Sequence, residues 1–392
     1  MAAERNLHSK EQYVQMSDVQ VCSKCISDTS IPGIRFDEHG ICNFCKAHDE
    51  LEKQFPLNEA GQQKFNRLIY KIKASGKSKK YDCIVGVSGG TDSTYCLYLA
   101  KKLGLRPLAV HLDNGWDSNI AVENISKANS KLNVDYKIVT CDWAEFKDLQ
   151  IAFLKASVSD AEIPTDIAII ATLYRVAAEE GIRYILNGHS FRAEGLSPTG
   201  WTYIDGRYIN GVYKSFNKGK LKSFPNLTIS NLLYYTFIKS IKTVPLLAYI
   251  NYSKEESKKI LQKELGWTYY GGHHFESVYT RFVITNLLPK KFNIDKRIVE
   301  FSAYIRSGQM TREQALESIK EALPEDKDIA EYCRNKLGLT TAEFEKILSS
   351  EPKTFRDYST YYPAIRALRL PIKIACMLNL LPHIFYAKYF NG

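Results

Sequence analysis

The sequence predicts an α/β protein built on a doubly wound parallel sheet. Apolar runs of strand length alternate with helical patterns between residues 81 and 186, an order typical of parallel sheets. The first apolar run ends in a glycine turn that opens directly into a helical pattern. In such folds ligands bind beyond the carboxyl ends of the strands, so the polar loops at those ends are the expected functional site.

Five apolar runs are the expected strands. In chain order they cover residues 81–87, 107–112, 135–140, 182–186 and 244–250. Helical periodicity predicts helices over residues 59–74, 92–103, 118–131, 143–157, 167–180, 254–265, 295–307, 311–322 and 341–348. Ser253 and Thr311 are the expected N-caps of two of them, each with a Glu or Gln three residues later.

Composition excludes several classes of protein. The 392 residues are 45% hydrophobic and 24% charged, as in soluble globular proteins. No uncharged apolar run is long enough to span a bilayer, and the polar N-terminus lacks a signal-peptide core, so a cytoplasmic location is expected. The net charge of +10 favours anionic ligands without choosing among them.

Residues 88–93, Ser-Gly-Gly-Thr-Asp-Ser, form the most informative motif. The glycines let the backbone turn tightly and approach an anion, and the first N–H groups of the following helix favour negative charge. Ser88 and Ser93 add hydroxyl donors, and Asp92 would hold Mg²⁺ that bridges to the anion. An ordinary turn with two glycines is the alternative, but it leaves Asp92 and the serines unexplained. The Gly-Lys-Ser/Thr ending of a Walker A loop is absent.

Four of the nine cysteines are spaced as zinc ligands. Cys22-x₂-Cys25 and Cys42-x₂-Cys45 are separated by 16 residues, which fits two knuckles around one tetrahedral ion. A closed four-sulfur site has no open position, so the predicted zinc is structural. Four unrelated thiols, or one redox-active pair, are the alternatives. The other cysteines show no ligand spacing, and Cys83 and Cys96 are expected in the core.

Two further loops follow predicted strands and are expected beside the same ligand. Asp113 and Asn114 come after the second strand, and Gly188 and His189 after the fourth. Glu194 continues the latter loop towards a second substrate. Plain turns are the alternative at both places.

A second dense group of polar residues lies at residues 271–277, Gly-Gly-His-His-Phe-Glu-Ser. His273, His274 and Glu276 suit proton transfer near neutral pH, substrate binding or metal ligation. A structural hydrogen-bonding role is the alternative. Arg281 follows and would neutralise a phosphate. In residues 358–392, apolar residues alternate with Arg and Lys, which favours packing on the core, with docking to a partner or to a membrane surface as the alternative.

The motif at residues 88–93 resembles the signature of the PP-loop ATP pyrophosphatases. The order of five motifs, spanning roughly residues 20–320, resembles the narrower N-acetyl sugar amidotransferase family of the WbpG and PseA type. These motifs are the cysteine module, Val87 with residues 88–93, residues 111–116 (His-Leu-Asp-Asn-Gly-Trp), residues 271–277, and residues 307–313 (Ser-Gly-Gln-Met-Thr-Arg-Glu).

The resemblance implies a reaction and a set of site residues. ATP would adenylate the oxygen of a sugar acetamido group, and ammonia would displace AMP to leave an acetamidine. The implied catalytic residues are Asp92, Ser93, His273, His274 and Glu276, with Glu194 and Arg281 on the substrate. The implied ATP-binding residues are Val87, Ser88, Gly89, Gly90, Thr91, Asp92, Ser93, Asp113, Asn114, Gly188 and His189. The cofactors would be ATP, Mg²⁺ at Asp92, and structural Zn²⁺ at Cys22, Cys25, Cys42 and Cys45.

The resemblance also implies partners. The substrate would be an anionic nucleotide-sugar with an acetamido group, used in O-antigen synthesis. Residue 2 is Ala and no glutaminase pattern is apparent, so ammonia would come from separate glutaminase and cyclase-like subunits resembling imidazole glycerol phosphate synthase. A nucleic-acid partner is not expected, because the basic residues form no long patch. Peripheral membrane contact is kept as an alternative.

Together these observations divide the chain into four segments. They are a flexible tail (1–17), a zinc-binding module (18–55), a PP-loop ATP pyrophosphatase domain (56–290) with a mobile insertion (195–229), and a helical C-terminal region (291–392). Asp205-Gly206 predicts a β-hairpin in the insertion. The rival functions are a PP-loop tRNA-modifying enzyme, either a thiolase or an amidating ligase, amidation of pseudaminic or legionaminic acid for flagellin, and a non-catalytic scaffold.

Overall fold

A five-stranded parallel sheet forms the centre of the molecule in the computed structural model, which describes residues 19–323, 325–377, 381, 386 and 389–390. The strand order is β3-β2-β1-β4-β5, and every pairing is parallel. The strands are β1 Cys83–Gly86, β2 Pro107–Asp113, β3 Tyr136–Thr140, β4 Tyr184–Asn187 and β5 Lys242–Pro245. The predicted fold class is confirmed. The predicted tail, residues 1–17, lies outside the described residues.

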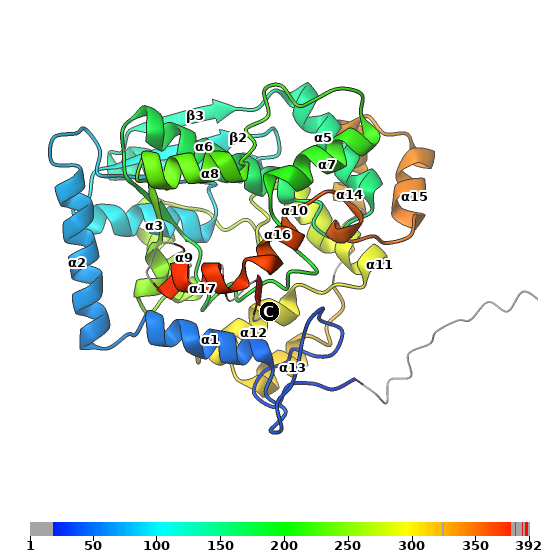
Figure 1. Cartoon of the computed structure of the whole chain (residues 1–392), viewed down its shortest axis with the longest axis horizontal. Helices are drawn as coiled ribbons and strands as arrows, with labels where there is room; N and C mark the ends of the chain where they lie inside the picture. Colours follow the sequence, from blue (N-terminus) through cyan, green and yellow to red (C-terminus); the bar gives the residue numbers. More distant parts are fainter. Residues whose placement is uncertain (1–18, 324, 378–380, 382–385, 387–388, 391–392) are drawn as a thin grey trace, which may run out of the picture.

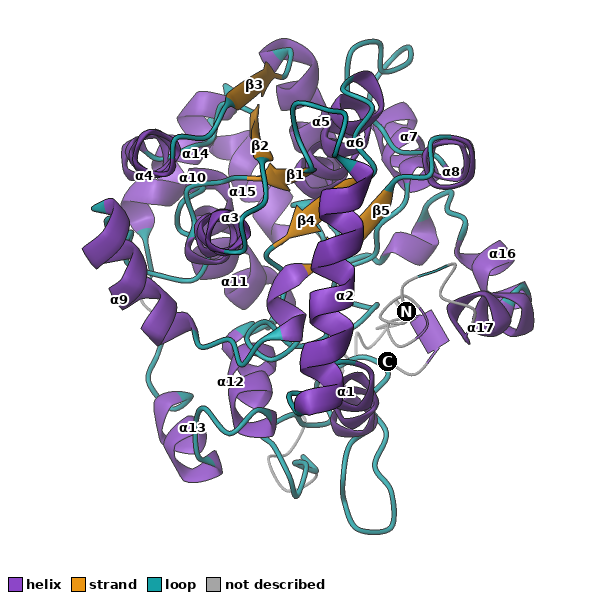
Figure 2. Ribbon diagram, turned by 90° about the vertical axis from the view of Figure 1, so that its left-hand side faces the viewer, coloured by secondary structure: helices purple, strands orange, loops and turns teal. Residues whose placement is uncertain are grey.

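Helices cover both faces of the sheet (Figure 1). Helices α3 and α6 both contact β1, β2 and β4, and they lie on opposite sides of the sheet in Figure 2. The first nine helices are α1 Asn43–Gln54, α2 Glu59–Ser75, α3 Thr91–Lys102, α4 Asn119–Leu132, α5 Trp143–Ala156, α6 Ile163–Glu179, α7 Gly206–Phe216, α8 Ile229–Leu233 and α9 Lys254–Leu265. Short helical turns follow α8 and β5 at η2 Tyr234–Ile238 and η3 Leu246–Tyr249.

The described part of the C-terminal region is helical, as predicted from residue 291, and its helices begin earlier than expected, at Val278. Its elements are α10 Val278–Phe282, η4 Val283–Leu287, α11 Leu288–Phe292, α12 Arg297–Arg306, α13 Arg312–Ser318, α14 Lys327–Leu337, α15 Thr341–Ser349, η5 Phe355–Asp357, α16 Tyr362–Ala367 and α17 Arg369–Met377. Thr311 caps α13 with the predicted capping box. None of the described helices combines the length and apolar character needed to cross a bilayer.

The direction of winding reverses between β1 and β4. From β1 the chain moves outward through β2 to β3, and it then returns to place β4 and β5 on the other side of β1. The switch point of the sheet therefore lies between β1 and β4, and in open α/β sheets ligands bind beyond the carboxyl ends of the strands at such a point.

The predicted hairpin at residues 205–206 is wrong. Asp205 is the N-cap of α7, and its side chain accepts a hydrogen bond from the Tyr208 backbone N–H. Tyr208, Ile209 and Val212 of α7 are fully buried, so helical periodicity prevails over the Asp-Gly turn signal. The mobility of residues 195–229 stays a prediction. The last strand also differs from the prediction: β5 ends at Pro245, and η3 occupies most of the residues expected to continue it.

One hydrophobic cluster runs through three of the predicted segments. It joins Phe44 and Leu51 of the cysteine segment to Trp116 of the sheet domain and to Phe282 and Phe344 of the C-terminal half. The cysteine segment thus packs as part of the molecule's core, and α12 and α13 lie beside it in Figure 1.

Candidate active site

The loop after β1 is closed by its own serines. Ser88 donates its backbone N–H to Ser93 Oγ at 3.1 Å, and the two hydroxyl oxygens lie 3.1 Å apart. Gly90 donates its N–H to Ser88 Oγ at 3.3 Å and stands as the N-cap of α3 without a side chain. The loop therefore presents hydroxyl groups at the open N-terminus of α3, where anions are stabilised by free N–H groups.

Two glycines let other segments approach this loop. Gly89 has φ +76°, and a Cβ there would lie 2.4 Å from the Ala121 carbonyl oxygen. A Cβ on Gly188 would lie 2.6 Å from the carbonyl carbon of Asp92. The loop after β4 thus packs directly against the first turn of α3, and only glycine permits this contact.

Asp92 lies at the centre of the site's electrostatics. Its carboxylate accepts a hydrogen bond from the Tyr252 hydroxyl, and Lys254 Nζ lies 3.3 Å from its Oδ2. Burial raises the pKa of Asp92, Lys254 opposes that effect, and the nearby Glu194 carboxylate adds to it. Although burial acts against it, the charge of His189 lowers the pKa of Glu194.

Asp92 and Glu194 suit a divalent cation. Asp92 lies in the first turn of α3 and Glu194 in the loop after β4; both line the same cavity, and the Glu194 charge raises the pKa of Asp92. Carboxylate oxygens are the usual protein ligands of Mg²⁺. These two residues would hold the ion, which would neutralise the phosphates of a bound nucleotide.

Glu276 contacts the loop after β1 from the C-terminal half of the chain. Its Oε1 accepts from Ser88 Oγ at 3.4 Å, and a Cβ on Gly90 would lie 2.4 Å from the same oxygen. His274, at φ +57°, faces this oxygen with Nδ1 at 3.4 Å. Although burial opposes it, the Glu276 carboxylate raises the pKa of His274 to about 9, so an imidazolium is expected here at neutral pH.

His111 and Asp117 lock the end of β2 beneath the site. His111 Nδ1 lies 2.8 Å from the Val87 carbonyl oxygen, and its Nε2 lies 2.8 Å from Asp117 Oδ2. Both neighbours are acceptors, so the ring donates on both sides as an imidazolium. Although burial opposes it, the Asp117 carboxylate raises the pKa of His111. The backbones of Ser277 and Asp117 form an isolated antiparallel β-bridge, which fixes the segment around Glu276 to the carboxyl end of β2.

These groups line one cavity of about 490 Å³. It extends from the loop after β1 to the first turn of α6, where Glu162, Thr165, Asp166 and Lys296 lie. Thr172 Oγ1 and Glu276 Oε2 are buried and have no hydrogen-bond partner within the described part of the chain. Buried polar atoms in this condition are costly, and a ligand could satisfy them.

Most of the residues predicted from sequence lie in the lining. They are Val87, Ser88, Gly90, Thr91, Asp92, Ser93, Asn114, Gly188, His189, Glu194, His274 and Glu276.

Four predicted site residues lie outside it. Gly89 packs on α4, and Asp113 Oδ1 accepts from the Gly115 N–H. His273 lies behind the lining, between Lys254 Nζ at 3.3 Å and Glu300 Oε1 at 3.2 Å. Arg281 forms an ion pair with Asp326, so its placement lends no support to the predicted substrate contact.

Sequence reasoning missed Lys254, Tyr252, Tyr270 and His111. Tyr270 OH accepts from the Thr91 N–H at 3.1 Å, at the mouth of the α3 N-terminus. Tyr252 and Lys254 follow the last strand, so the rule that ligands bind beyond strand ends could have found them. His111 was hidden within an otherwise apolar strand.

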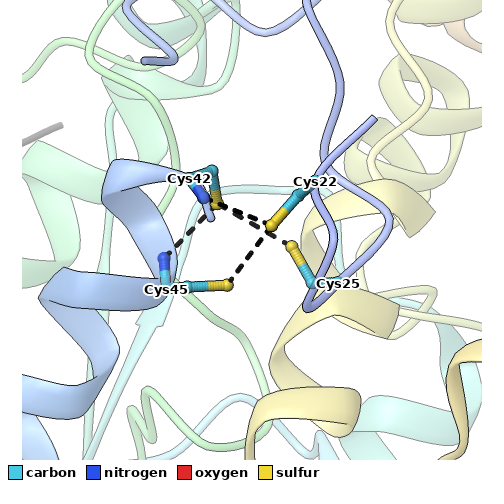
Figure 3. Close-up of side chains that lie close together, drawn as sticks. All are labelled: Cys22, Cys25, Cys42 and Cys45. Atoms are coloured by element: carbon cyan, nitrogen blue, oxygen red, sulfur yellow. Dashed lines mark hydrogen bonds between the residues drawn. The ribbon is translucent and has the colours of Figure 1, made fainter. Parts of the chain in front are cut away.

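The four cysteines converge as predicted (Figure 3). All are fully buried, with Cys22 and Cys45 sulfurs 3.9 Å apart and Cys25 and Cys42 sulfurs 3.8 Å apart. A tetrahedron with zinc–sulfur bonds of about 2.3 Å has edges of roughly 3.8 Å, so the four sulfurs fit one zinc ion.

The C-terminal helices contribute to the cysteine cluster. Arg306 of α12 donates from Nε to Cys45 Sγ and from Nη2 to Cys25 Sγ, both at 3.2 Å. Arg312 of α13 donates to the carbonyl oxygens of Cys25 and Cys22 at 3.1 and 3.2 Å. A tetrathiolate zinc site carries net negative charge, which the guanidinium of Arg306 offsets.

Two family models match parts of the chain. Residues 276–370 match the C-terminal domain of WbpG-like lipopolysaccharide biosynthesis proteins, and residues 82–169 match queuosine biosynthesis protein QueC. An uncharacterized protein of Methanocaldococcus jannaschii, MJ1599, is 25% identical over 324 residues, covering 80% of this chain and 98% of its own.

Solved structures with a related architecture are distant. A predicted subunit of tRNA methyltransferase from Methanocaldococcus jannaschii is 15% identical, with a TM-score of 0.28, over 46% of this chain and 75% of its own. The NH3-dependent NAD synthetase of Campylobacter jejuni is 16% identical, with a TM-score of 0.27, over 52% of this chain and 83% of its own. The matches of these two segments to family models, together with the parallel sheet and the loop at residues 88–93, support a WbpG-like protein of the PP-loop superfamily.

Proposed function

We propose that this protein is an ATP-dependent amidotransferase that converts the acetamido group of an anionic sugar into an acetamidine in surface polysaccharide synthesis. One observation carries the proposal. The first residue of the WbpG-like segment, Glu276, lies against Ser88 and Gly90 of the PP-loop, so the two matched segments build one cavity. A domain that closes a nucleotide site is placed to choose the group that ATP activates.

The chemistry follows from the poor reactivity of an amide. The acetamido oxygen attacks the α-phosphorus of ATP, and pyrophosphate leaves. Ammonia then adds to the imidate carbon, the carbon–oxygen bond to AMP breaks, and a proton is released. Ser88, Ser93 and the N-terminus of α3 hold the departing pyrophosphate, where fixed donors offset developing charge. Asp92 and Glu194 would hold Mg²⁺, which would supply Lewis-acid neutralisation of the phosphate charge.

The acetamido oxygen provides the test, because it must end in AMP. Candidate nucleotide-sugars carrying a heavy oxygen isotope in the acetyl group are incubated with the protein, ATP, Mg²⁺ and ammonium, and the products are read by mass spectrometry. We expect heavy AMP together with a sugar in which NH replaces oxygen. Light AMP formed alongside acetamidine would rule out adenylation of the amide. A matched Asp92→Asn variant is expected to form neither product.

The nitrogen supply is part of the proposal. The chain carries no apparent glutaminase pattern, so ammonia is expected from separate glutaminase and cyclase-like subunits. With ammonium the purified chain is expected to be active alone, and with glutamine only when those subunits are added. An equal glutamine-dependent rate without them would contradict a multi-chain enzyme.

The match of residues 82–169 to the QueC model favours a second candidate, a tRNA-modifying PP-loop enzyme. A filter-binding assay with bulk tRNA separates the two. Binding that survives moderate salt, together with tRNA-stimulated release of AMP, would favour this candidate over the sugar amidotransferase.

A further inference from the structure

We propose that the four-cysteine module positions the loop after β4 through the ion pair between buried Arg192 and half-buried Glu52, so that zinc loading sets the affinity of the distant site for Mg-ATP. The inference rests on the proposed ATP site, and it is independent of which group the enzyme amidates. Arg192 belongs to the loop after β4, two residues before Glu194. Only 1% of the surface of Arg192 is exposed.

The Arg192 guanidinium is held mainly by the cysteine module. It donates to Glu52 through two bonds, Nε to Oε1 at 2.7 Å and Nη2 to Oε2 at 2.6 Å. It also donates to the carbonyl oxygens of Phe55 at 2.7 Å and Ala248 at 2.6 Å. Glu52 belongs to α1 and Phe55 is its C-cap residue. A buried guanidinium needs these acceptors, so the position of α1 determines the position of Arg192.

The backbone of Arg192 is held by the C-terminal half. Its carbonyl oxygen accepts from Ser307 Oγ at 2.9 Å and from Gln309 Nε2 at 3.3 Å. Arg192 lies within a tight turn, in which the Ser190 carbonyl oxygen accepts from the N–H groups of residues 193 and 194 at 3.0 and 2.8 Å. Glu194 is therefore carried by a segment that is fixed on both sides.

Both sets of contacts lead back to the cysteine cluster. Cys42 is the N-cap of α1 and Cys45 lies in its first turn, and Glu52 follows about two turns later on the same helix. On the other side, Arg306 contacts the sulfurs of Cys45 and Cys25, and Ser307 is the next residue. The contacts form a closed ring from the cluster through α1, Arg192 and α12 back to the cluster.

Loss of the zinc ion would break this ring at the cysteine cluster. Without the metal, the four thiols no longer fix the first turn of α1 against α12. The contacts that hold Arg192 and the turn carrying Glu194 could then shift relative to each other. Misplacing a ligating carboxylate would weaken its contact with the cation and would leave binding of the adenosine part of the ligand unchanged. Zinc removal should therefore act mainly through the magnesium requirement.

The test measures binding of Mg-ATP and of adenosine by titration calorimetry. The samples are wild-type protein, zinc-depleted protein, Arg192→Lys, Glu52→Gln, and the control Glu50→Gln, which alters an exposed ion pair on the same helix. We expect roughly tenfold weaker Mg-ATP binding and a higher Mg²⁺ requirement in the zinc-depleted, Arg192→Lys and Glu52→Gln samples, because changing the residues that orient a metal ligand typically costs about 10–100-fold. Adenosine binding should be unchanged, and the control should match wild type.

A double-mutant cycle separates positioning from general loosening. If Arg192 acts through Glu194, Arg192→Lys should cost little once Glu194→Gln is present, whereas independent effects would add. Additive effects, an equal loss of adenosine binding, or unchanged Mg-ATP affinity in folded variants would overturn the inference. Should Glu52→Gln fail to fold, Arg192→Lys and zinc depletion decide. Wild-type protein that binds no ATP would instead refute the proposed function.

Discussion

A buried charge pair dominates the site at the scale of single residues. Lys254 is about nine-tenths buried and faces Asp92, and although burial opposes it, the Asp92 carboxylate raises the pKa of Lys254. Glu300 adds to that effect from α12. Each charge is tolerable only because the other is present.

Lys254→Met should therefore destabilise the protein by roughly 3 kcal/mol, because it leaves the buried Asp92 carboxylate without its cation. The loss should shrink at acidic pH, where Asp92 takes up a proton. Urea unfolding at two pH values measures both effects. Lys53→Met, which breaks an exposed ion pair, is the control and should change the midpoint little. Equal midpoints for Lys254→Met and wild type at neutral pH would contradict the pairing.

The His274–Glu276 pair predicts a pH dependence of nucleotide binding. The pKa of His274 rises from 6.5 to about 9, so its favourable interaction with Glu276 is fully present below pH 6.5 and is lost as pH rises through about 9. Mg-ATP affinity should fall over the upper part of this window, since an imidazolium beside the phosphate site becomes neutral. Titration calorimetry across the window checks this.

His274→Gln should flatten the pH profile, and exposed His39→Gln should not. A profile that is already flat in wild type would show that His274 does not bear on the nucleotide.

Single residues of the site were predictable where a local motif defines them. Ser88, Gly90 and Asp92 belong to a turn whose chemistry reads directly from consecutive residues. Lys254 and Tyr252 act from more than 150 positions away, and only the pairing of β4 with β5 brings them to Asp92. Their place after the last strand could have marked them as candidates, but no local pattern could show their contact with Asp92.

At the scale of elements, the sheet was predictable because its strands are short apolar runs that alternate with helices. The error at residues 205–206 has a local cause. Gly206 suits a turn, but its lack of a side chain is needed for packing, since a Cβ there would lie 2.5 Å from the Leu227 carbonyl oxygen. The same residue type thus serves a helix start rather than a hairpin.

The two cysteine knuckles predict a zinc content of about one ion per chain. Cys42→Ser should abolish it while keeping the start of α1 capped, because Ser is a favoured N-cap residue and its hydroxyl can accept the Cys45 N–H as the Cys42 sulfur does. Elemental mass spectrometry of purified protein measures the zinc. Cys141→Ser, at a half-buried position outside the cluster, is the control and should keep the ion. Purified wild-type protein that contains no zinc, and whose unfolding midpoint does not change when a chelator is added, would contradict a structural zinc site.

At the scale of the whole molecule, the core crosses the segment boundaries predicted from sequence. Phe44, Trp116, Phe282 and Phe344 share one cluster, although the sequence patterns placed boundaries near residues 55 and 290. Sequence patterns report local periodicity, whereas a shared core depends on contacts between distant segments. The segments are therefore expected to depend on one another for stability.

A single cooperative transition follows from this shared core. Trp116 and Trp143 report on the sheet domain by fluorescence, while a chelating dye reports release of zinc from the N-terminal module. In a urea titration both signals should change at the same midpoint, because opening the cysteine cluster exposes the core that the sheet domain shares. Zinc release well before any change in fluorescence would mean that the module unfolds by itself. In that case the ring of contacts through Arg192 would be too weak to couple the two sites.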